Sequence, residues 1–391
     1  MTKESITAQF QSIFGKNSDC TVRAPGRINL IGEHLDYNGG FVLPAAIDKA
    51  IWFTMGRRED GELHFHSADL HESFVGTVNS IQKSDKNWAN YLLGVISEAQ
   101  KDGLEIGGVN VVFGGDIPIG AGLSSSAALE SGMMAGLNEL FSLGLSKMDI
   151  VRLAQRGENN FVGMKCGIMD MFASVMGREG HVVRLDCQSL DFQYIPFNAD
   201  NLNLLLFDSG VKHALVDSEY NTRRKECETG LRFFREKYPS IQSFRDLHYT
   251  HVLAEEAHLP SAVFKRCKYV VEELVRVEET CKALNANDLQ RFGLLMLDCH
   301  EGLHADYEVT CPETDYLVRQ AMMHEGVLGA RQMGGGFGGC TLNLVKEADT
   351  ADFVGKMKMA YSGQFGIDLK CYPVKLEAGT TLSVSLAIAG L

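Results

Sequence analysis

The chain has 391 residues, a formal net charge of −13 at pH 7 and 45% hydrophobic residues. This composition permits a large core in roughly two to three domains and excludes a disordered chain, while the acidic balance argues against nucleic acid or an anionic membrane as a partner. The start lacks an apolar signal segment, no apolar run approaches a membrane span, and ten cysteines without a CxxC pair favour reduced thiols, so a cytoplasmic protein is expected.

The first third of the chain predicts strands followed by a helix. The strand segments are CTVRAPGR, FVLPAAI, AIWFTMGRR and LHFHS, each bounded by Gly, Asp or Pro. Within the first of them, Pro25 and Gly26 predict a turn of the chain. NWANYLLGVISEAQKDG predicts an amphipathic helix that ends at Gly103. GVNVVFGGDIP then alternates Val109, Val111 and Phe113 on one face, as a strand does.

The middle and last thirds mix helices and strands. SSSAALESGMMAGLNELFSLG has small and apolar residues on all sides and predicts a buried helix, followed by a second helix at KMDIVRLAQRGENNFVG. HVVRLDC and LNLLLFDSG predict strands, SEYNTRRKECETGLRFFREK a charged helix, residues 262–325 mostly helix, and GGGFGGCTLNLV a glycine turn and strand. The order is α+β rather than alternating βαβ, with a domain boundary expected near residues 178–190.

The stretch APGRINLIGEHLDYNGG, residues 24–40, crowds Glu33, His34 and Asp36 into four positions. Carboxylates accept hydrogen bonds from vicinal hydroxyls, and an imidazole accepts or donates, so the group suits a polyol ligand. One isolated acid here would indicate a turn with a surface ion pair. Three directional groups in four positions favour ligand binding.

The stretch GDIPIGAGLSSSAALE, residues 115–130, predicts a strand, a glycine turn, a serine cluster and a helix start. A helix start carries free backbone N–H groups and partial positive charge, which attract anions. Gly120 and Gly122 allow close backbone approach, and three serines add hydroxyls. The alternative is a glycine turn with a serine N-cap on a core helix. The coincidence favours phosphate binding, although the pattern is neither a Walker loop nor a Rossmann fingerprint.

Two carboxylates complete this hypothesis. Glu158 lies in a predicted helix, and Asp170 lies in CGIMDMF after Gly167. Taken alone, they read as a solvated helix acid and a turn or cap residue. Beside a phosphate loop they gain a role, because phosphoryl transfer needs a carboxylate near the attacking hydroxyl and a metal on the phosphates.

A competing pattern occurs near the C-terminal end of the helical region. His300, Glu301 and His304 form a literal HExxH, which on a helix binds zinc in metalloproteases. Gly302 weakens that helix, and so short a pattern arises by chance. A zinc protease is therefore disfavoured.

Three motifs resemble a known family. GRINLIGEHLDY is similar to the galactokinase signature, GAGLSSSAA to the ATP loop of the GHMP kinase superfamily, and GGGFGGC, residues 334–340, to that superfamily's third motif. The resemblance implies two domains: an N-terminal ribosomal protein S5 domain 2-like domain over residues 1–185 and a C-terminal ferredoxin-like GHMP kinase domain over 186–391. The active site is then expected between them.

The resemblance implies an enzyme that uses ATP and Mg²⁺ to phosphorylate α-D-galactose at its anomeric hydroxyl. The implied sugar-binding residues are Glu33, His34, Leu35, Asp36 and Tyr220. The implied ATP-binding residues are Ser67, Gly120, Ala121, Gly122, Leu123, Ser124, Ser125 and Ser126. Ser126 and Glu158 match the metal ligands, Asp170 the base, and Arg27 the arginine that stabilises the transition state.

One departure and two alternatives accompany the resemblance. Met171 stands where galactokinases usually carry Gln, which predicts a missing hydrogen bond near Asp170. A related kinase for N-acetylgalactosamine, arabinose or galacturonate is one alternative. A non-catalytic galactose and ATP sensor is the other, although such sensors are altered in the serine loop and this chain keeps Ser126 and Ala127. The sequence does not fix the oligomeric state, and we expect a monomer.

Overall fold

The strands near the N-terminus form one sheet in the order β13-β1-β3-β6-β4-β5 in the computed structural model, which describes residues 1–118, 120–212 and 216–384. Its strands are β1 (Cys20–Asn29), β3 (Pro44–Arg58), β4 (Glu62–Ser67), β5 (Glu72–Thr77), β6 (Gly108–Gly115) and β13 (Thr381–Val384). Neighbouring strands run antiparallel except β4 and β6, which run parallel. The predicted α+β class is confirmed.

Two local predictions in this sheet are wrong. Pro25 and Gly26 form no turn, because β1 continues through them and the pairing with β3 shifts register between Pro25 and Arg27. Between these pairs one residue of β1, Gly26, stands opposite three of β3, residues 47–49, so the extra residues of the bulge belong to β3 and the proline does not end β1. The two strands expected at residues 41–47 and 50–58 are mostly one, β3, preceded by the short β2 (Phe41–Val42).

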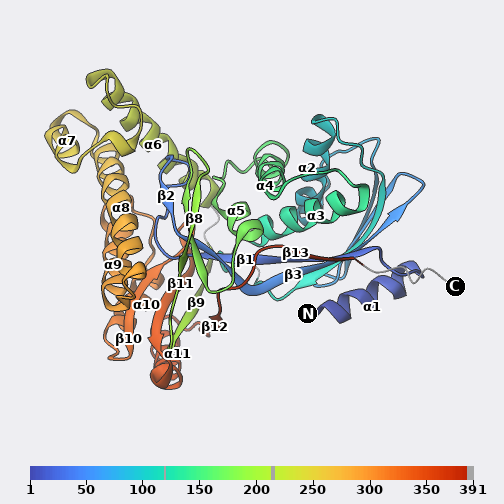
Figure 1. Cartoon of the computed structure of the whole chain (residues 1–391). Helices are drawn as coiled ribbons and strands as arrows, with labels where there is room; N and C mark the ends of the chain where they lie inside the picture. The colour runs from blue at the N-terminus through green and yellow to red at the C-terminus, as the bar shows by residue number, and fades with distance from the viewer. Residues whose placement is uncertain (119, 213–215, 385–391) are drawn as a thin grey trace.

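Helices cover both faces of this sheet. In Figure 1, α2 (Asn87–Lys101), α3 (Ser125–Phe141), α4 (Lys147–Arg156) and α5 (Met169–Met176) lie on one face, and α1 (Lys3–Phe14) on the other. The predicted buried helix is confirmed, because α3 packs directly on β1 and β3. A Cβ at Gly132 would collide with the ring of Phe53.

The second half of the chain builds a smaller sheet with a thick helical layer. The sheet order is β10-β11-β9-β12, from β9 (Leu202–Lys212), β10 (Val327–Gln332), β11 (Gly338–Lys346) and β12 (Lys370–Val374). The helices are α6 (Val216–Lys237), α7 (Tyr249–Ala254), α8 (Ser261–Asn285), α9 (Leu289–Gly302), α10 (Pro312–Met322) and α11 (Thr350–Phe365). The single-turn segments are η2 (Phe244–Asp246), η3 (Glu256–His258), η4 (Leu303–Tyr307) and η5 (Glu347–Asp349). The charged helix and the helical region at 262–325 are confirmed.

Two connections tie the halves together. A small sheet in the order β2-β7-β8 joins Phe41–Val42 to β7 (His181–Asp186) and β8 (Phe192–Pro196). The last described strand, β13, returns to the first sheet and pairs with the start of β1, Cys20 opposite Val384. The domain division at residues 185 and 186 stays a prediction, and β13 lies in the N-terminal sheet although it follows that division.

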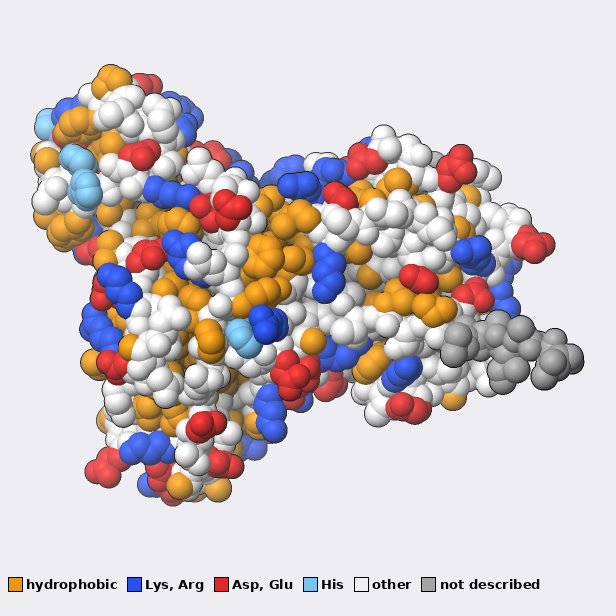
Figure 2. All heavy atoms as spheres, in the orientation of Figure 1, with side chains coloured by type: hydrophobic (Ala, Val, Ile, Leu, Met, Phe, Trp, Pro, Cys, Tyr) orange, Lys and Arg blue, Asp and Glu red, His pale blue; other side chains and the backbone are white. Residues whose placement is uncertain are grey.

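The outer surface carries mixed charge. Figure 2 shows two lobes with an indentation between them, and on this face basic, acidic and apolar side chains are interspersed. Within the described residues, the helices are too short or too polar to cross a membrane. All ten cysteines are free.

Candidate active site

A cavity of about 430 Å³ is lined by residues from both halves of the chain. The lining residues are Arg27, Glu33, His34, Asp36, Asn87, Tyr91, Val162, Gly163, Met164, Cys166, Gly167, Met169, Asp170, Tyr220, Asn221, Gly334 and Gly335. The cavity therefore gathers Arg27 from β1, Asp170 from α5, the acidic segment after β1, and the glycine turn between β10 and β11.

Arg27 and Asp170 form a bidentate ion pair in the cavity wall. Arg27 Nε donates to Asp170 Oδ1 at 2.7 Å, and Nη2 donates to Oδ2 at 2.8 Å. The remaining Nη1 donates to the carbonyl of Gly122 at 2.6 Å. Burial by itself lowers the pKa of Arg27, but the carboxylate of Asp170 outweighs it and raises that pKa. The guanidinium is thus a fixed positive charge that joins Asp170 to the glycine loop.

The glycine loop leads into α3 without a serine cap. Gly122 has φ +74°, a left-handed conformation that favours glycine. Ser124 occupies the N-cap position, yet its side chain makes no capping bond. Its Oγ donates instead to Asp170 Oδ2 at 2.5 Å. The N-cap alternative is therefore wrong for Ser124, and the start of α3 does not depend on this hydroxyl.

Ser126 and Glu158 lie together, as the metal-site hypothesis requires. Glu158 is buried in the single π-turn η1 (Gly157–Val162), and it accepts hydrogen bonds from the Ser126 hydroxyl and from Cys166 Sγ at 3.4 Å. Burial, and next the nearby Asp170, raises the pKa of Glu158 to about 7. A serine oxygen beside a carboxylate is a hard oxygen donor set, which fits Mg²⁺.

No group of three His, Cys, Asp or Glu side chains with a metal-binding arrangement occurs in the described ranges. Magnesium that binds together with nucleotide phosphates takes only one or two ligands from protein. The pair of Ser126 and Glu158 supplies that number.

The carboxylate of Glu33 is held from the C-terminal half. Glu33 Oε1 accepts from the backbone N–H of Gly334 at 2.8 Å and lies 2.6 Å from Arg331 Nη2. Both side chains are buried, Arg331 completely. The neighbouring backbone is fixed too, since Glu273 Oε1 accepts from the N–H of Gly32 at 2.8 Å. One carboxylate oxygen of Glu33 thus accepts a hydrogen bond from Gly334 and forms an ion pair with Arg331, which fixes the side chain in the cavity wall.

His34 presents a neutral imidazole. Its Nδ1 lies 2.9 Å from the hydroxyl of Tyr37, and its Nε2 is buried with no hydrogen-bond partner among the described residues. Burial, reinforced by Arg223 and Arg331, lowers the pKa of His34 to about 3. A neutral ring with an unbound nitrogen in the wall of a cavity suits a hydroxyl ligand.

Asp36 and Tyr220 complete this wall. Burial, and next the charge of Asp170, raises the pKa of Asp36 to about 7. A Cβ at position 167 would collide with the Asp36 carboxylate, so Gly167 makes the room for it. The Tyr220 ring lies 5.6 Å from the His34 ring, and burial raises the pKa of its hydroxyl well above the ordinary value.

Several predicted site residues do not reach the cavity. Leu35 is fully buried in the hydrophobic core, so its side chain anchors the segment instead of touching a ligand. Ser67 is buried at the end of β4, opposite Phe113 of β6, and is not part of the lining. Ala121 and Leu123 are buried, and the other predicted loop and metal residues also lie outside the lining of this cavity: Gly120, Gly122, Ser124, Ser125, Ser126 and Glu158.

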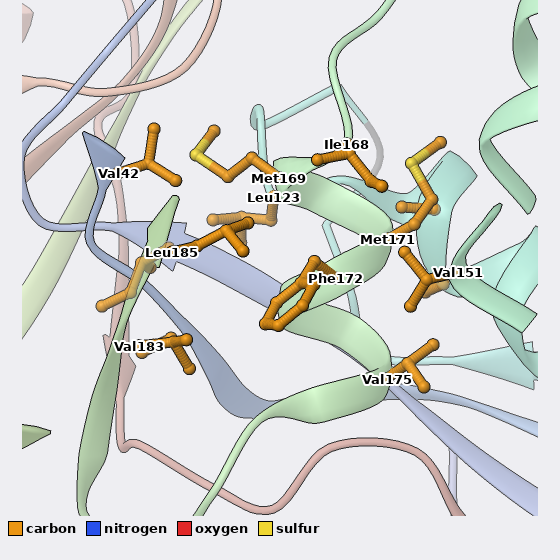
Figure 3. Packing of buried hydrophobic residues seen from close by; sticks show 14 of the residues in the cluster. Val42, Leu123, Val151, Ile168, Met169, Met171, Phe172, Val175, Val183 and Leu185 are labelled. Atoms are coloured by element: carbon orange, nitrogen blue, oxygen red, sulfur yellow. The ribbon is translucent and has the colours of Figure 1, made fainter. Parts of the chain in front are cut away.

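Met171 points away from the cavity. Figure 3 shows its side chain beside Val151 and Ile168 within the apolar cluster, and it is fully buried. Asp170, one residue earlier, is nevertheless bound by Arg27 and Ser124. Met171 thus packs in the core behind α5, and the ion pair of Asp170 with Arg27 is complete.

The residues that hold the site from behind are not marked by the sequence motifs. Arg331 lies three residues before the glycine motif, and that closeness was an available signal. Glu273 and Tyr307 lie in helical segments where nothing in the local pattern marks them. Tyr307 contacts Tyr37 through their hydroxyls at 2.8 Å, a contact between residues far apart in the sequence.

Comparison with known proteins supports a single family. Residues 8–57 match a galactokinase galactose-binding signature, residues 90–178 the N-terminal domain of GHMP kinases, and residues 280–357 their C-terminal domain. A galactokinase of Thermosipho africanus is 41% identical over 92% of this chain and 99% of its own length. One of Clostridium beijerinckii is 40% identical over 96% of this chain and 97% of its own.

A solved structure agrees over the same extent. The galactokinase of Lactococcus lactis, crystallised with galactose, superposes with a TM-score of 0.93 at 33% identity and covers 97% of this chain and 99% of that one. A mevalonate kinase superposes with a TM-score of 0.63 at 19% identity, which shows a shared fold alone.

Proposed function

The chain belongs to the galactokinase family of the GHMP kinases, and we propose that its cavity is where ATP phosphorylates galactose at the anomeric hydroxyl. The observation that carries this assignment is the ion pair of Arg27 and Asp170, which lies between the serine loop and the acidic segment. A phosphoryl donor bound on one side and a sugar on the other would meet at this pair.

We propose that galactose lies against Glu33, His34, Asp36 and Tyr220. The carboxylates accept from sugar hydroxyls, and His34 Nε2 accepts from or donates to one according to its tautomer. The backbone of the segment is fixed through Gly32 and Glu33, so these groups are in place before the sugar arrives. Leu35 contributes by anchoring this segment in the core.

We propose that Asp170 is the base and Arg27 the charge stabiliser. The anomeric hydroxyl transfers its proton to Asp170 as its oxygen forms a bond to the γ-phosphorus, and the bond from that phosphorus to the β–γ bridging oxygen breaks, so that ADP leaves. The carboxylate has lone pairs beyond those that Arg27 and Ser124 use. Arg27 is already positioned and offsets charge on the moving phosphoryl group without reorganisation.

The ATP phosphates would lie on the loop from Gly120 to Ser126 and the start of α3, where backbone N–H groups and the helix dipole favour anions. Ser126 and Glu158 would hold Mg²⁺, which neutralises phosphate charge when it is bound. Ser67 remains a proposed nucleotide contact with the weakest support, since it is buried within β4.

The alternatives are not favoured. Curated relatives at 37–41% identity over nearly the whole chain are galactokinases. The chain also carries the side chains proposed for phosphoryl transfer, which are Arg27, Ser126, Glu158 and Asp170. We also propose a cytoplasmic location, on the strength of ten free cysteines, and a monomeric enzyme.

A kinase assay with ATP and Mg²⁺ over a panel of free sugars tests the proposal. Galactose is expected to give the highest kcat/KM, above N-acetylgalactosamine, arabinose and galacturonate. A clear preference for one of these three would overturn the substrate assignment. Galactose binding without turnover would instead favour the sensor.

A further inference from the structure

The HExxH residues, unused by the proposed reaction, lie directly behind the glycine turn. His300 is buried near the end of α9, whereas the side chain of His304 is 55% exposed. Both rings contact Asp315 of α10: His300 Nε2 lies 3.3 Å from its Oδ1, and His304 Nδ1 lies 2.9 Å from its Oδ2. The two histidines of the motif therefore contact the same carboxylate, that of Asp315.

The other nitrogen of His300 reaches the strand that carries the sugar-binding donors. β10 is an edge strand of its sheet, so one row of its backbone N–H groups points away from β11. The N–H of Gln332 donates to His300 Nδ1 at 3.2 Å. Helix α9 runs along this edge, and a Cβ at Gly293 would collide with the backbone of Leu328. His300 thus accepts the hydrogen bond of the backbone N–H of Gln332, the last residue of the edge strand β10.

The hydrogen bond fixes the tautomer of His300. A backbone N–H donates only, so Nδ1 is the acceptor and the ring proton lies on Nε2, facing Asp315. The negative charge of Asp315 beside Nε2 favours this ring orientation by proximity, without a hydrogen bond of good geometry, and Nδ1 of the oriented ring holds the N–H of the strand. The side chain of Gln332 is bound as well, by Thr314 and by the carbonyl of Val309.

Gln332 lies between the two groups that hold Glu33. Arg331 immediately precedes it, and Gly334 follows two residues later. A shift of the Gln332 backbone therefore moves both the ion-pair partner Arg331 and the donor N–H of Gly334 relative to the Glu33 carboxylate. We propose that His300, oriented by Asp315, is a positioning residue for sugar binding, which acts through Gln332 on Arg331 and Gly334; this inference rests on the proposed role of Glu33.

Two substitutions separate positioning from simple packing. His300→Asn keeps an oxygen acceptor where Nδ1 lies but leaves a space and an unpaired Asp315. His300→Gln fills more of the space and reaches toward Asp315, but it places no acceptor opposite the Gln332 N–H. If His300 has a purely structural role, His300→Asn should raise the KM for galactose more than His300→Gln does. If His300 positions the strand, His300→Gln should raise it more.

The experiment is steady-state kinetics with hydrogen exchange of peptides that cover residues 327–338. His300→Gln is expected to raise the KM for galactose about fivefold, as for one lost buried hydrogen bond, with kcat and the KM for ATP retained and exchange accelerated. The KM for galactose of His300→Asn is expected to stay within about twofold of that of the unmodified chain. His304→Gln, the exposed neighbour on the same carboxylate, is the matched control and is expected to change neither readout.

Equal galactose KM values for the Asn and Gln variants, or a higher one for Asn, would overturn the proposal. So would stoichiometric zinc in the purified chain that His300→Gln and His304→Gln both remove. Should the Gln variant not fold, nitrogen NMR of the unmodified chain decides, because a proton on Nδ1 of His300 contradicts the geometry. If galactose is not a substrate at all, the proposed function fails, while exchange and NMR still test the contact.

Discussion

Asp170 is bound on both of its carboxylate oxygens and has a proposed catalytic role as well. It accepts two hydrogen bonds from Arg27 and one from Ser124, and it is also the proposed proton acceptor. Replacing it with Asn keeps the size and some hydrogen bonding but removes the proton acceptor. We expect kcat to fall by about 10²-fold or more, with galactose affinity in calorimetry largely retained. Turnover near that of the unmodified chain, under conditions where chemistry limits the rate, would contradict the assignment of the base.

From the proposed contact of Asp36 with galactose, we expect galactose binding to depend on pH. Its pKa is raised to about 7 in the free cavity, by burial first and by Asp170 next. A sugar hydroxyl donates to the ionised form, so bound galactose lowers this pKa, and affinity must rise as pH increases toward 7 and then level off. Calorimetry without ATP or Mg²⁺ should give a Kd about tenfold higher at about pH 6 than above pH 7.

Two controls identify the titrating group. Asp36→Asn is expected to bind galactose more weakly and with a flat pH profile. Glu158, whose pKa is also raised to about 7, belongs to the proposed metal site, so Glu158→Gln should keep the pH dependence. If Glu158→Gln flattens the pH profile, the titrating group is Glu158, and the assignment to Asp36 is wrong.

At the scale of elements, a π-turn sets the position of Glu158. η1 follows α4 directly and packs on α2, where the backbones of Gly94 and Gly157 nearly touch. A Cβ at Gly157 would lie 3.1 Å from the backbone of Gly94 and Val95. Insertions of this kind often occur at functional sites, because they turn one side chain out of the helical register.

The consequence is testable with one methyl group. Gly157→Ala should push η1 away from α2 and displace Glu158, so the Mg²⁺ concentration for half-maximal activity should rise while calorimetric galactose affinity is kept. Gly163, the residue directly after η1, has φ +105° and lines the cavity, and a Cβ there meets nothing within 4 Å. Gly163→Ala therefore strains the backbone at the end of η1 without a contact to α2, and it serves as the control for strain alone. An unchanged Mg²⁺ requirement in Gly157→Ala would remove the link between the close contact and the metal site.

The elements also show how far sequence reasoning reaches. Periodicity predicted α3 and β6, because a buried face is a local property of the pattern. Motifs predicted Arg27, Glu33, His34, Asp36, Asp170 and Tyr220, all of which line the cavity. The edge position of β10 and the long-range pairs of Glu33 with Arg331 and of Gly32 with Glu273 depend on how distant elements pack. The proline-glycine pair predicts a turn from local preference alone, whereas the continuation of β1 through Pro25 depends on its pairing with β3.

At the scale of the molecule, the segment proposed to bind the sugar, residues 30–36, joins the two halves. Leu30 and Glu33 are bound by Arg331, and the carbonyl of Glu33 accepts from the hydroxyl of Tyr269 at 3.1 Å. A ligand on this segment therefore stabilises both halves. Galactose at about 100 times its Kd should add about 2.7 kcal/mol to the free energy of unfolding.

Scanning calorimetry with and without galactose measures this effect. The whole transition is expected to move to higher temperature as one unit, and Glu33→Gln should lose most of the shift. If calorimetry instead shows two transitions and galactose shifts only one of them, the segment does not couple the two halves.

The pairing of β13 with β1 has a consequence for synthesis. Cys20 to Arg23 emerge from the ribosome among the first residues, but their partners Thr381 to Val384 come near the end of the chain. At ordinary elongation rates this separation corresponds to roughly 20 to 70 seconds. Throughout that interval one side of β1 lacks its strand partner, and an unpaired strand is a template for aggregation. The nascent chain thus has a vulnerable period that the finished protein does not, and chaperone dependence during expression should be greatest before the last strand is made.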